Sequence, residues 1–186
     1  MQSMRTMASE NRRALVVVDM QNDFVYGSLG NEQCRAVVPE VCAVIRGGGY
    51  DSIYVTMDTH GGDYLSTQEG RNLPVEHCIE GTQGWELVED VSAAIAASGL
   101  KAEQVRKGTF GSLGLARILR RDCPPDASVD IVGVCTDICV VSNALILKAA
   151  CPEMKVSVIS RCCAGSSPER HEAALLTMRS CQVDVI

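Results

Sequence analysis

Cys139 is the residue of this sequence best placed to act as a nucleophile. It lies in the stretch GVCTDICVVSNALILKAA, just after the apolar run 129–134 and in the first turn of an expected helix. A thiol in a first helical turn faces free backbone N–H groups and the positive end of the helix dipole, which lower its pKa towards the reactive thiolate. The order of strand, turn, thiol and helix therefore predicts nucleophilic catalysis at Cys139.

Two charged residues at other expected strand ends supply what a nucleophilic thiol needs. Asp19 directly follows the apolar run ALVVV, and Lys107 follows a weaker strand segment and precedes GTFGSLG. A carboxylate at a buried strand end needs a partner, and Lys107 is a plausible one. The alternatives are a turn-capping Asp19 and a surface Lys107 beside Arg106. Asp23, four residues after Asp19, is expected to be a solvated loop acid.

The elements that would position these side chains alternate between strand and helix. Expected strands cover 14–19, 52–57, 104–106, 129–134, 155–160 and 182–186, and expected helices cover 33–46, 84–97, 112–121, 137–149 and 168–179. This alternation predicts an α/β, doubly wound, three-layer αβα fold with a six-stranded, largely parallel sheet. Reactive groups gather at the C-terminal edge of such a sheet. The long polar loop 61–81 is also expected to be functional, because long loops in compact domains usually are.

Three stretches resemble the cysteine hydrolases of the isochorismatase-like superfamily. They are VVVDMQNDF with Asp19, Lys107 ahead of GTFGS, and GVCTDICV with Cys139, and they occur in the order typical of that family from about Ala14 to the C-terminus. The resemblance implies a catalytic Asp-Lys-Cys triad at these positions. It also implies a cis peptide bond before Cys135 and an oxyanion hole formed by the backbone N–H groups of Cys135 and Cys139.

A second group of residues resembles the metal site of nicotinamidases, the branch that hydrolyses nicotinamide. Asp58 and His60 form a DxH pattern at the end of an expected strand, and His77 follows the polar loop. Glu69 occupies the place of a loop carboxylate that some nicotinamidases use as a further ligand, although a loop acid is often only solvated. One carboxylate and two imidazoles with an open position suit one divalent ion, Zn²⁺ first, with Fe²⁺ or Mn²⁺ as alternatives.

Aromatic residues near the triad are candidates for binding a planar substrate. Phe24 and Phe110 each lie within a few residues of a catalytic candidate, whereas Trp85 and Tyr64 could line the pocket or simply belong to the core.

The sequence also departs from the nicotinamidase pattern. Nicotinamidases commonly have a tryptophan just before the second metal-binding histidine, but residues 72–77 read NLPVEH here. The resemblance is therefore firmer for the hydrolytic chemistry than for nicotinamide as substrate.

Bulk composition narrows the class of protein. A chain of 186 residues that is 46% hydrophobic can bury one core, so we expect a flexible segment 1–13 followed by a single domain 14–186. The net charge of −6 and the lack of a long basic run argue against binding to nucleic acid or to a membrane. Expected partners are a small-molecule amide and other copies of the chain, as a homo-oligomer. The N-terminus lacks the hydrophobic centre of a signal peptide, which favours a cytoplasmic protein.

Ten cysteines would suggest a disulfide scaffold only in a small secreted domain. Here most are interpreted as reduced core or near-surface thiols. Several lie in or beside expected helices and strands, among them Cys34, Cys42, Cys123, Cys151 and Cys181. Cys78, beside His77, is a weak candidate for a soft zinc ligand. His171 is expected on the polar side of the last helix, facing solvent or serving a structural role.

The favoured function is hydrolysis of a small primary carboxamide, nicotinamide first, through a thioester on Cys139, a reaction of NAD salvage. Asp19 would accept the thiol proton, and Lys107 would keep Asp19 ionised. One alternative is another isochorismatase-like hydrolase that acts on a different amide, a ureido compound or a vinyl ether. A more distant alternative is a noncatalytic thiol-rich metal or redox protein.

Overall fold

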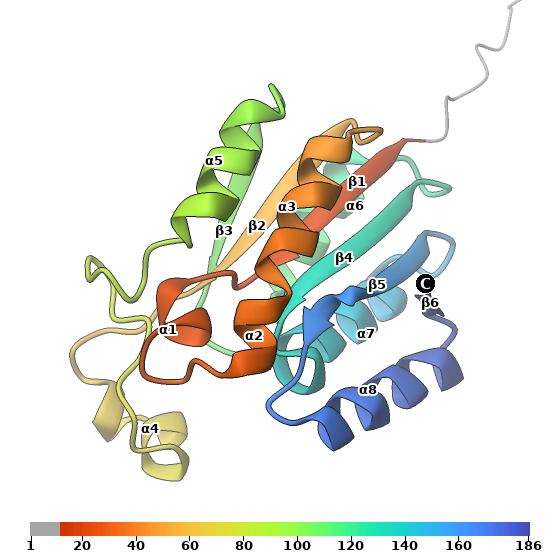
Figure 1. Cartoon of the computed structure of the whole chain (residues 1–186). Helices are drawn as coiled ribbons and strands as arrows, with labels where there is room; N and C mark the ends of the chain where they lie inside the picture. The colour runs from red at the N-terminus through yellow and green to blue at the C-terminus, as the bar shows by residue number, and fades with distance from the viewer. Residues whose placement is uncertain (1–11) are drawn as a thin grey trace, which may run out of the picture.

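The computed structural model describes residues 12–186, so the segment 1–13, expected to be flexible, falls almost wholly outside the described residues. Its centre is a six-stranded sheet in which every pair of neighbouring strands is parallel (Figure 1). The strands are β1 (Arg13–Val18), β2 (Ser52–Asp58), β3 (Ala102–Lys107), β4 (Ser128–Val134), β5 (Lys155–Ala164) and β6 (Asp184–Val185), in the order β3-β2-β1-β4-β5-β6. The predicted α/β fold with a parallel sheet is confirmed.

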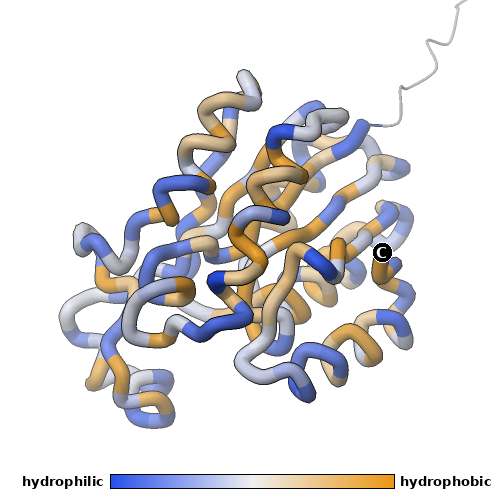
Figure 2. The backbone as a smooth tube through the Cα atoms, in the orientation of Figure 1, coloured by the Kyte–Doolittle hydropathy of each residue, from blue (hydrophilic) through white to orange (hydrophobic). Residues whose placement is uncertain are grey.

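Helices cover both faces of this sheet and complete the three layers. The first side carries α1 (Asn22–Val25), α2 (Glu32–Ala36), α3 (Val38–Gly47) and α5 (Glu89–Ala97), and the second carries α6 (Leu113–Asp122), α7 (Val141–Ala150) and α8 (Pro168–Ser180). Residues of β1 alternate between the two layers: Leu15 and Val17 face the first side, and Val16 and Val18 face the second. Hydrophobic residues accordingly gather along the strands (Figure 2).

Some predicted helix boundaries are wrong. The expected helix 33–46 is divided into α2 and α3, because Pro39 in the first turn of α3 has no N–H to continue the hydrogen-bond ladder of α2. The expected helix 84–97 begins only at Glu89. The expected helix 137–149 begins as a π-helical turn, Thr136–Val140, before α7. The loop 61–81 contains the 3₁₀ turn Tyr64–Ser66 and the short helix α4 (Gln68–Asn72).

The strand order creates the crevice in which the candidate residues lie. The chain proceeds from β1 outward to β2 and β3, and later returns to β4 on the other side of β1. The connections that leave β1 and β4 therefore diverge, which opens a crevice at the carboxyl ends of these strands. Gly133 allows β4 to approach β1 closely here: its φ is +120°, and a Cβ at this position would lie 2.1 Å from the carbonyl oxygen of Val18.

Among residues 12–186, no helix combines the length and the apolar character needed to span a bilayer.

Candidate active site and metal centre

Asp19 leaves the end of β1 with its carboxylate fixed in the crevice. Its backbone has a left-handed φ of 48°, which is uncommon for a residue with a side chain, and its side chain is fully buried. Thr56 on the neighbouring strand holds it, because the Thr56 hydroxyl donates to Asp19 Oδ1 over 2.6 Å and the Thr56 carbonyl accepts from the Asp19 N–H over 3.2 Å. One carboxylate oxygen is therefore used for positioning.

Lys107 joins the other candidates. It ends β3 directly opposite Asp58 in the β2–β3 register, with its side chain only 2% exposed. Its Nζ lies 2.7 Å from Asp19 Oδ2, 3.1 Å from Asp58 Oδ1 and 3.6 Å from Cys139 Sγ. The structure thus brings Asp19, Lys107 and Cys139 together. It also adds a link that the sequence did not suggest, because the same ammonium group contacts the predicted metal ligand Asp58.

The Asp19 oxygen nearest to Lys107 remains available as an acceptor. Oδ2 is ion-paired with Lys107 at 2.7 Å, yet it takes part in no hydrogen bond with acceptable angles among the described residues. Burial raises the pKa of Asp19, and the charge of Lys107 opposes this rise only in part. A buried carboxylate with an open oxygen and a raised pKa is a good proton acceptor.

The environment of Cys139 corrects the expectation of a lowered thiol pKa. Cys139 is 4% exposed, and burial raises the pKa of its thiol well above the ordinary value. The negative charge of Asp19 raises the pKa further, and Lys107 opposes the rise. Desolvation outweighs the helix dipole that the sequence argument invoked. The resting thiol is therefore protonated and needs a base.

The turn that carries Cys139 is held from several sides. The peptide bond between Val134 and Cys135 is cis. The Cys135 carbonyl accepts hydrogen bonds from the N–H groups of Ile138 (3.1 Å) and Val140 (3.0 Å), a pattern that passes over the N–H of Cys139. The backbone of Cys135 and Cys139 therefore lies at the turn where an oxyanion hole was predicted.

Helix α8 and the residue Ser166 just before it support the same turn. The Thr136 hydroxyl lies 2.8 Å from His171 Nδ1, and the Asp137 carboxylate accepts from both the N–H (2.8 Å) and the hydroxyl (2.6 Å) of Ser166. Of the two readings left open for His171, this contact favours the structural one.

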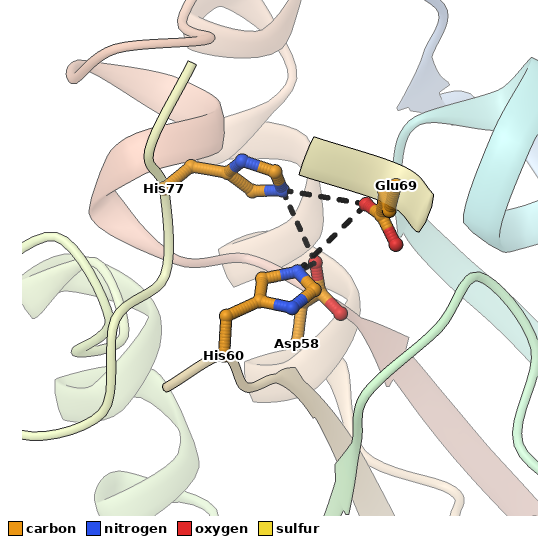
Figure 3. A group of neighbouring side chains, drawn as sticks. All are labelled: Asp58, His60, Glu69 and His77. Carbon is orange, nitrogen blue, oxygen red and sulfur yellow. Dashed lines mark hydrogen bonds and ion pairs between the residues drawn. The ribbon is translucent and has the colours of Figure 1, made fainter. Parts of the chain in front are cut away.

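Asp58, His60, Glu69 and His77 converge in one cluster (Figure 3). One ligand atom from each lies within 4.8 Å of the others. Asp58 Oδ2 lies 3.1 Å from His60 Nε2 and 3.5 Å from His77 Nε2, and Glu69 Oε1 lies 3.8 Å from both imidazoles. Two imidazole nitrogens and two carboxylates form a donor set that suits a divalent transition metal.

Burial and charge shift the pKa values of two residues of this cluster, Asp58 and His77. Burial would raise the pKa of Asp58, but hydrogen bonds from His60 and His77 hold it below its ordinary range. Burial would lower the pKa of His77, but its hydrogen bonds to Asp58 and to the Val75 carbonyl raise it overall. Because His77 Nδ1 lies 2.9 Å from the Val75 carbonyl, Nε2 is the nitrogen that faces the cluster.

Packing around the cluster fixes the two imidazoles. Tyr64 is fully buried against both rings, with centroid distances of 4.7 Å to His60 and 4.9 Å to His77, and its hydroxyl donates to the Leu73 carbonyl. Phe24 packs edge-on to His77 at 5.5 Å. The ring of Tyr64 therefore belongs to the support of the cluster and is absent from the residues that line the cavity beside it.

One expectation near the cluster is wrong, and one weak alternative is not supported. Asp23 is half-buried and accepts a 2.8 Å hydrogen bond from the Cys78 N–H, so it fastens the His77 segment to α1 instead of acting as a solvated acid. Cys78 is buried and lies outside the group of potential ligands, and burial raises the pKa of its thiol. All ten cysteines are free, and eight are buried, whereas Cys135 is half-buried and Cys181 is exposed.

Gln21 is a supporting residue that the sequence reasoning missed. Its buried amide donates to the carbonyls of Asp58 and Trp85 over 2.8 Å each, and its Oε1 accepts from the Asp58 N–H over 2.7 Å. The side chain thereby connects the end of β1 with the end of β2. A polar residue two positions after Asp19, where the chain has just left a buried strand, was the available signal.

An open cavity of about 800 Å³ adjoins the cluster. Its lining includes His60, Glu69, Leu73, Phe110 and Ile138. Phe110 is 45% exposed at the mouth of the cavity, whereas Phe24 lies buried behind His77.

Trp85 lies elsewhere. It lines a different cavity of about 670 Å³ beside α5 and β3, in which none of the clustered side chains takes part. Its indole donates to the Thr59 hydroxyl over 2.9 Å. Trp85 therefore does not face the candidate site.

Comparison with known proteins identifies the family of this chain. The isochorismatase domain model matches residues 13–186. The chain belongs to the isochorismatase family. It is 29% identical to the nicotinamidase of Schizosaccharomyces pombe, over 93% of this chain and 92% of that protein. Among solved structures of this family, a nicotinamidase/pyrazinamidase from Bacillus subtilis matches at 28% identity with a TM-score of 0.79, and the zinc complex of a pyrazinamidase from Pyrococcus horikoshii matches at 29% identity with a TM-score of 0.75. Each alignment spans 94% of this chain and 98% of the solved chain.

Proposed function

We propose that this isochorismatase-family chain is a metal-dependent cysteine amidohydrolase that converts nicotinamide into nicotinate and ammonia. The observation that carries the proposal is the position of Lys107 Nζ between Asp19 (2.7 Å), Cys139 (3.6 Å) and Asp58 (3.1 Å) of the metal cluster. A base, a thiol and a metal-binding group are thereby placed around one ammonium. The similarity to nicotinamidases and pyrazinamidases supports the choice of an aromatic carboxamide.

The first half-reaction begins with a proton transfer from the Cys139 thiol to Asp19. The open Oδ2 and the raised pKa of Asp19 favour this transfer, and the nearby Lys107 charge stabilises the thiolate that forms. The thiolate then attacks the carboxamide carbon. The oxyanion is stabilised by the backbone N–H groups of Cys135 and Cys139. The protonated Asp19 returns the proton to the departing nitrogen, so ammonia leaves and a thioester remains.

The second half-reaction reverses these roles with water. Asp19 accepts a proton from a water molecule, which attacks the thioester carbon, and the thiolate is expelled as the carboxylic acid forms. Asp19 then returns the proton to Cys139. Lys107 remains protonated throughout, because its carboxylate neighbours and the thiolate raise its pKa, although burial alone would lower it.

Asp58, His60, Glu69 and His77 would hold one divalent ion, with Zn²⁺ the first choice and Fe²⁺ or Mn²⁺ as alternatives. When bound, such an ion supplies a Lewis-acid site that can orient a ring nitrogen or a water molecule. Glu69 reaches the cluster from α4, in which Thr67 caps the first turn by accepting from the Gly70 N–H over 3.0 Å. The cap fixes the first turn of α4, which contains Glu69, and so supports Glu69 as the fourth ligand.

One observation favours a second candidate substrate. The cavity wall offers Leu73, 38% exposed, in the segment where nicotinamidases commonly have a tryptophan. An aliphatic wall beside Phe110 gives a planar ring less stacking surface and leaves room for a larger group. A different small amide, a ureido compound or a vinyl ether is therefore the second candidate.

A substrate panel separates these candidates. The metal-loaded protein is incubated with nicotinamide, pyrazinamide, benzamide, an aliphatic amide, a ureido compound and isochorismate, and the products are quantified, including ammonia from the amides. Preferential release of ammonia from nicotinamide, lost in Cys139→Ala, supports the proposal. Hydrolysis of another member of the panel, with nicotinamide unchanged, would assign the chain to a different activity of the same family.

A further inference from the structure

Asn143 is a buried amide side chain that the reaction described above does not use. It lies in the first turn of α7 and is 1% exposed. Asparagine is a poor residue for a helix, and a buried amide is costly unless its hydrogen bonds are made. The position of Asn143 therefore depends on the hydrogen bonds that its amide makes.

The amide of Asn143 makes three hydrogen bonds that connect two segments. Its Nδ2 donates to the Cys139 carbonyl (2.8 Å) and to the Phe110 carbonyl (3.3 Å), and its Oδ1 accepts from the Ser112 N–H (3.0 Å). Both amide protons and the oxygen are thus used. One contact is made to the backbone carbonyl of the nucleophilic residue, and two are made to the loop that follows Lys107.

This loop is short and fixed at both ends. Lys107 ends β3, and Ser112 caps α6 by accepting from the Leu115 N–H over 3.0 Å. The loop also packs closely on α7 at Gly111, where an added Cβ would lie 2.4 Å from Ile146 Cδ1. A displacement of the loop from α7 would therefore move Lys107 relative to Cys139.

We propose that Asn143 is a positioning residue that sets the separation of Lys107 Nζ and Cys139 Sγ by fastening the loop 107–112 to the nucleophile helix. This inference rests on the proposed function, because it concerns the same thiol and ammonium group. The 3.6 Å separation across which Lys107 stabilises the thiolate is the quantity that the three hydrogen bonds maintain. Asn143 acts through its neighbours, since its amide contacts backbone groups and not the reacting atoms.

The test measures the rate at which iodoacetamide alkylates Cys139, followed by mass spectrometry of the peptide that contains this residue. Asn143→Leu keeps the number and branching of the side-chain heavy atoms and removes all three hydrogen bonds, and Asn143→Asp keeps the acceptor for Ser112 but loses the donors. A misplacement of about 1 Å can cost roughly 10²-fold in rate, so we expect kcat to fall by about 10- to 100-fold in Asn143→Leu. Alkylation should slow by about 10-fold, and by no more than the loss caused by removing Lys107 itself. The Asn143→Asp variant provides the same test if Asn143→Leu does not fold.

A double-mutant cycle with Lys107→Met distinguishes positioning from a general loss of structure. If Asn143 acts through Lys107, Asn143→Leu slows alkylation in the wild-type background and adds less than about twofold in the Lys107→Met background. The stoichiometry of labelling at Cys139 stays at one, and the effect on kcat exceeds that on KM. Thr177→Val, which removes a 2.9 Å side-chain bond to the carbonyl four residues earlier on α8, is the matched control and alkylates at the wild-type rate.

Equal slowing by Asn143→Leu in both backgrounds would overturn the proposal, as would a wild-type alkylation rate in this variant. The alkylation cycle needs no substrate. A wild-type protein that hydrolyses no amide but shows the expected coupling would therefore refute the proposed function and leave the role of Asn143 intact.

Discussion

Replacing Lys107 with methionine should slow the alkylation of Cys139, because the variant loses the positive charge that stabilises the thiolate. The Nζ to Sγ separation is 3.6 Å. At an effective dielectric constant of about 20, two unit charges at this separation attract each other by about 4 to 5 kcal/mol. Since each ~1.4 kcal/mol is a factor of ten, the thiolate population should fall by a factor on the order of 10³.

Two effects make the loss of alkylation rate smaller than the loss of thiolate population. A more basic thiolate is more nucleophilic, and a Brønsted coefficient of about 0.4 to 0.5 recovers roughly 20- to 30-fold. In addition, Asp19 is buried, and without Lys107 it takes up a proton, which removes negative charge beside the thiol. We therefore expect Lys107→Met to alkylate about 10- to 50-fold more slowly near neutral pH, with its rate profile displaced to higher pH.

The assay is the pseudo-first-order rate of iodoacetamide labelling at Cys139 between pH 6 and 10, read at that peptide because nine other cysteines are present. Lys101→Met is the control, since Lys101 is exposed at the other end of the same strand region. Its profile should match that of the wild type. A Lys107→Met profile that coincides with the wild type over this range would refute the electrostatic role of Lys107.

Three further predictions concern the other residues of the site. Cys139→Ala should abolish amide hydrolysis with metal content unchanged, whereas Cys135→Ala should retain much activity because its proposed contribution comes from the backbone; comparable losses in steady-state assays would reject these roles. Asp19→Asn should be nearly as inactive as Cys139→Ala, because an amide does not accept the thiol proton, and appreciable ammonia release by this variant would remove the base from the mechanism. His77→Ala should lose most of its metal on dialysis, measured by atomic emission. Glu69→Gln should lose more than the roughly 10- to 100-fold in affinity that is typical of residues that only support a ligand. Full metal in both variants would exclude this cluster.

The strands could be predicted from sequence because their signals are local. Runs such as ALVVV are β-branched and apolar, and burial on both faces of a parallel sheet selects such runs. The positions of Asp19 and Lys107 at strand ends followed from the same signals. The division of the first long helix was less apparent, although Pro39 was visible in the sequence, because the apolar periodicity continues across it.

Properties that depend on tertiary burial could not be read from sequence. A helix dipole alone would lower the pKa of Cys139, but burial of the thiol raises it instead. Likewise, Asp23 looked like a solvated acid until the Cys78 segment, distant in sequence, was found to donate to it. The amides of Gln21 and Asn143 carry no motif of their own, since their partners are backbone groups of other segments.

The contact between Lys107 and Asp58 follows from strand register, and it lets one ammonium group balance two buried carboxylates. Asp58 pairs with Lys107 across β2 and β3, while Thr56, two residues earlier, supports Asp19 across β1 and β2. One ammonium thus faces two buried carboxylates, of which Asp58 also faces the imidazoles. An uncompensated buried carboxylate would be costly. Asp58 Oδ1 is directed to Lys107 and Oδ2 to the histidines, so this residue connects the thiol chemistry with the proposed metal centre. A change in metal binding should therefore alter the reactivity of Cys139, and loss of Lys107 should alter metal affinity.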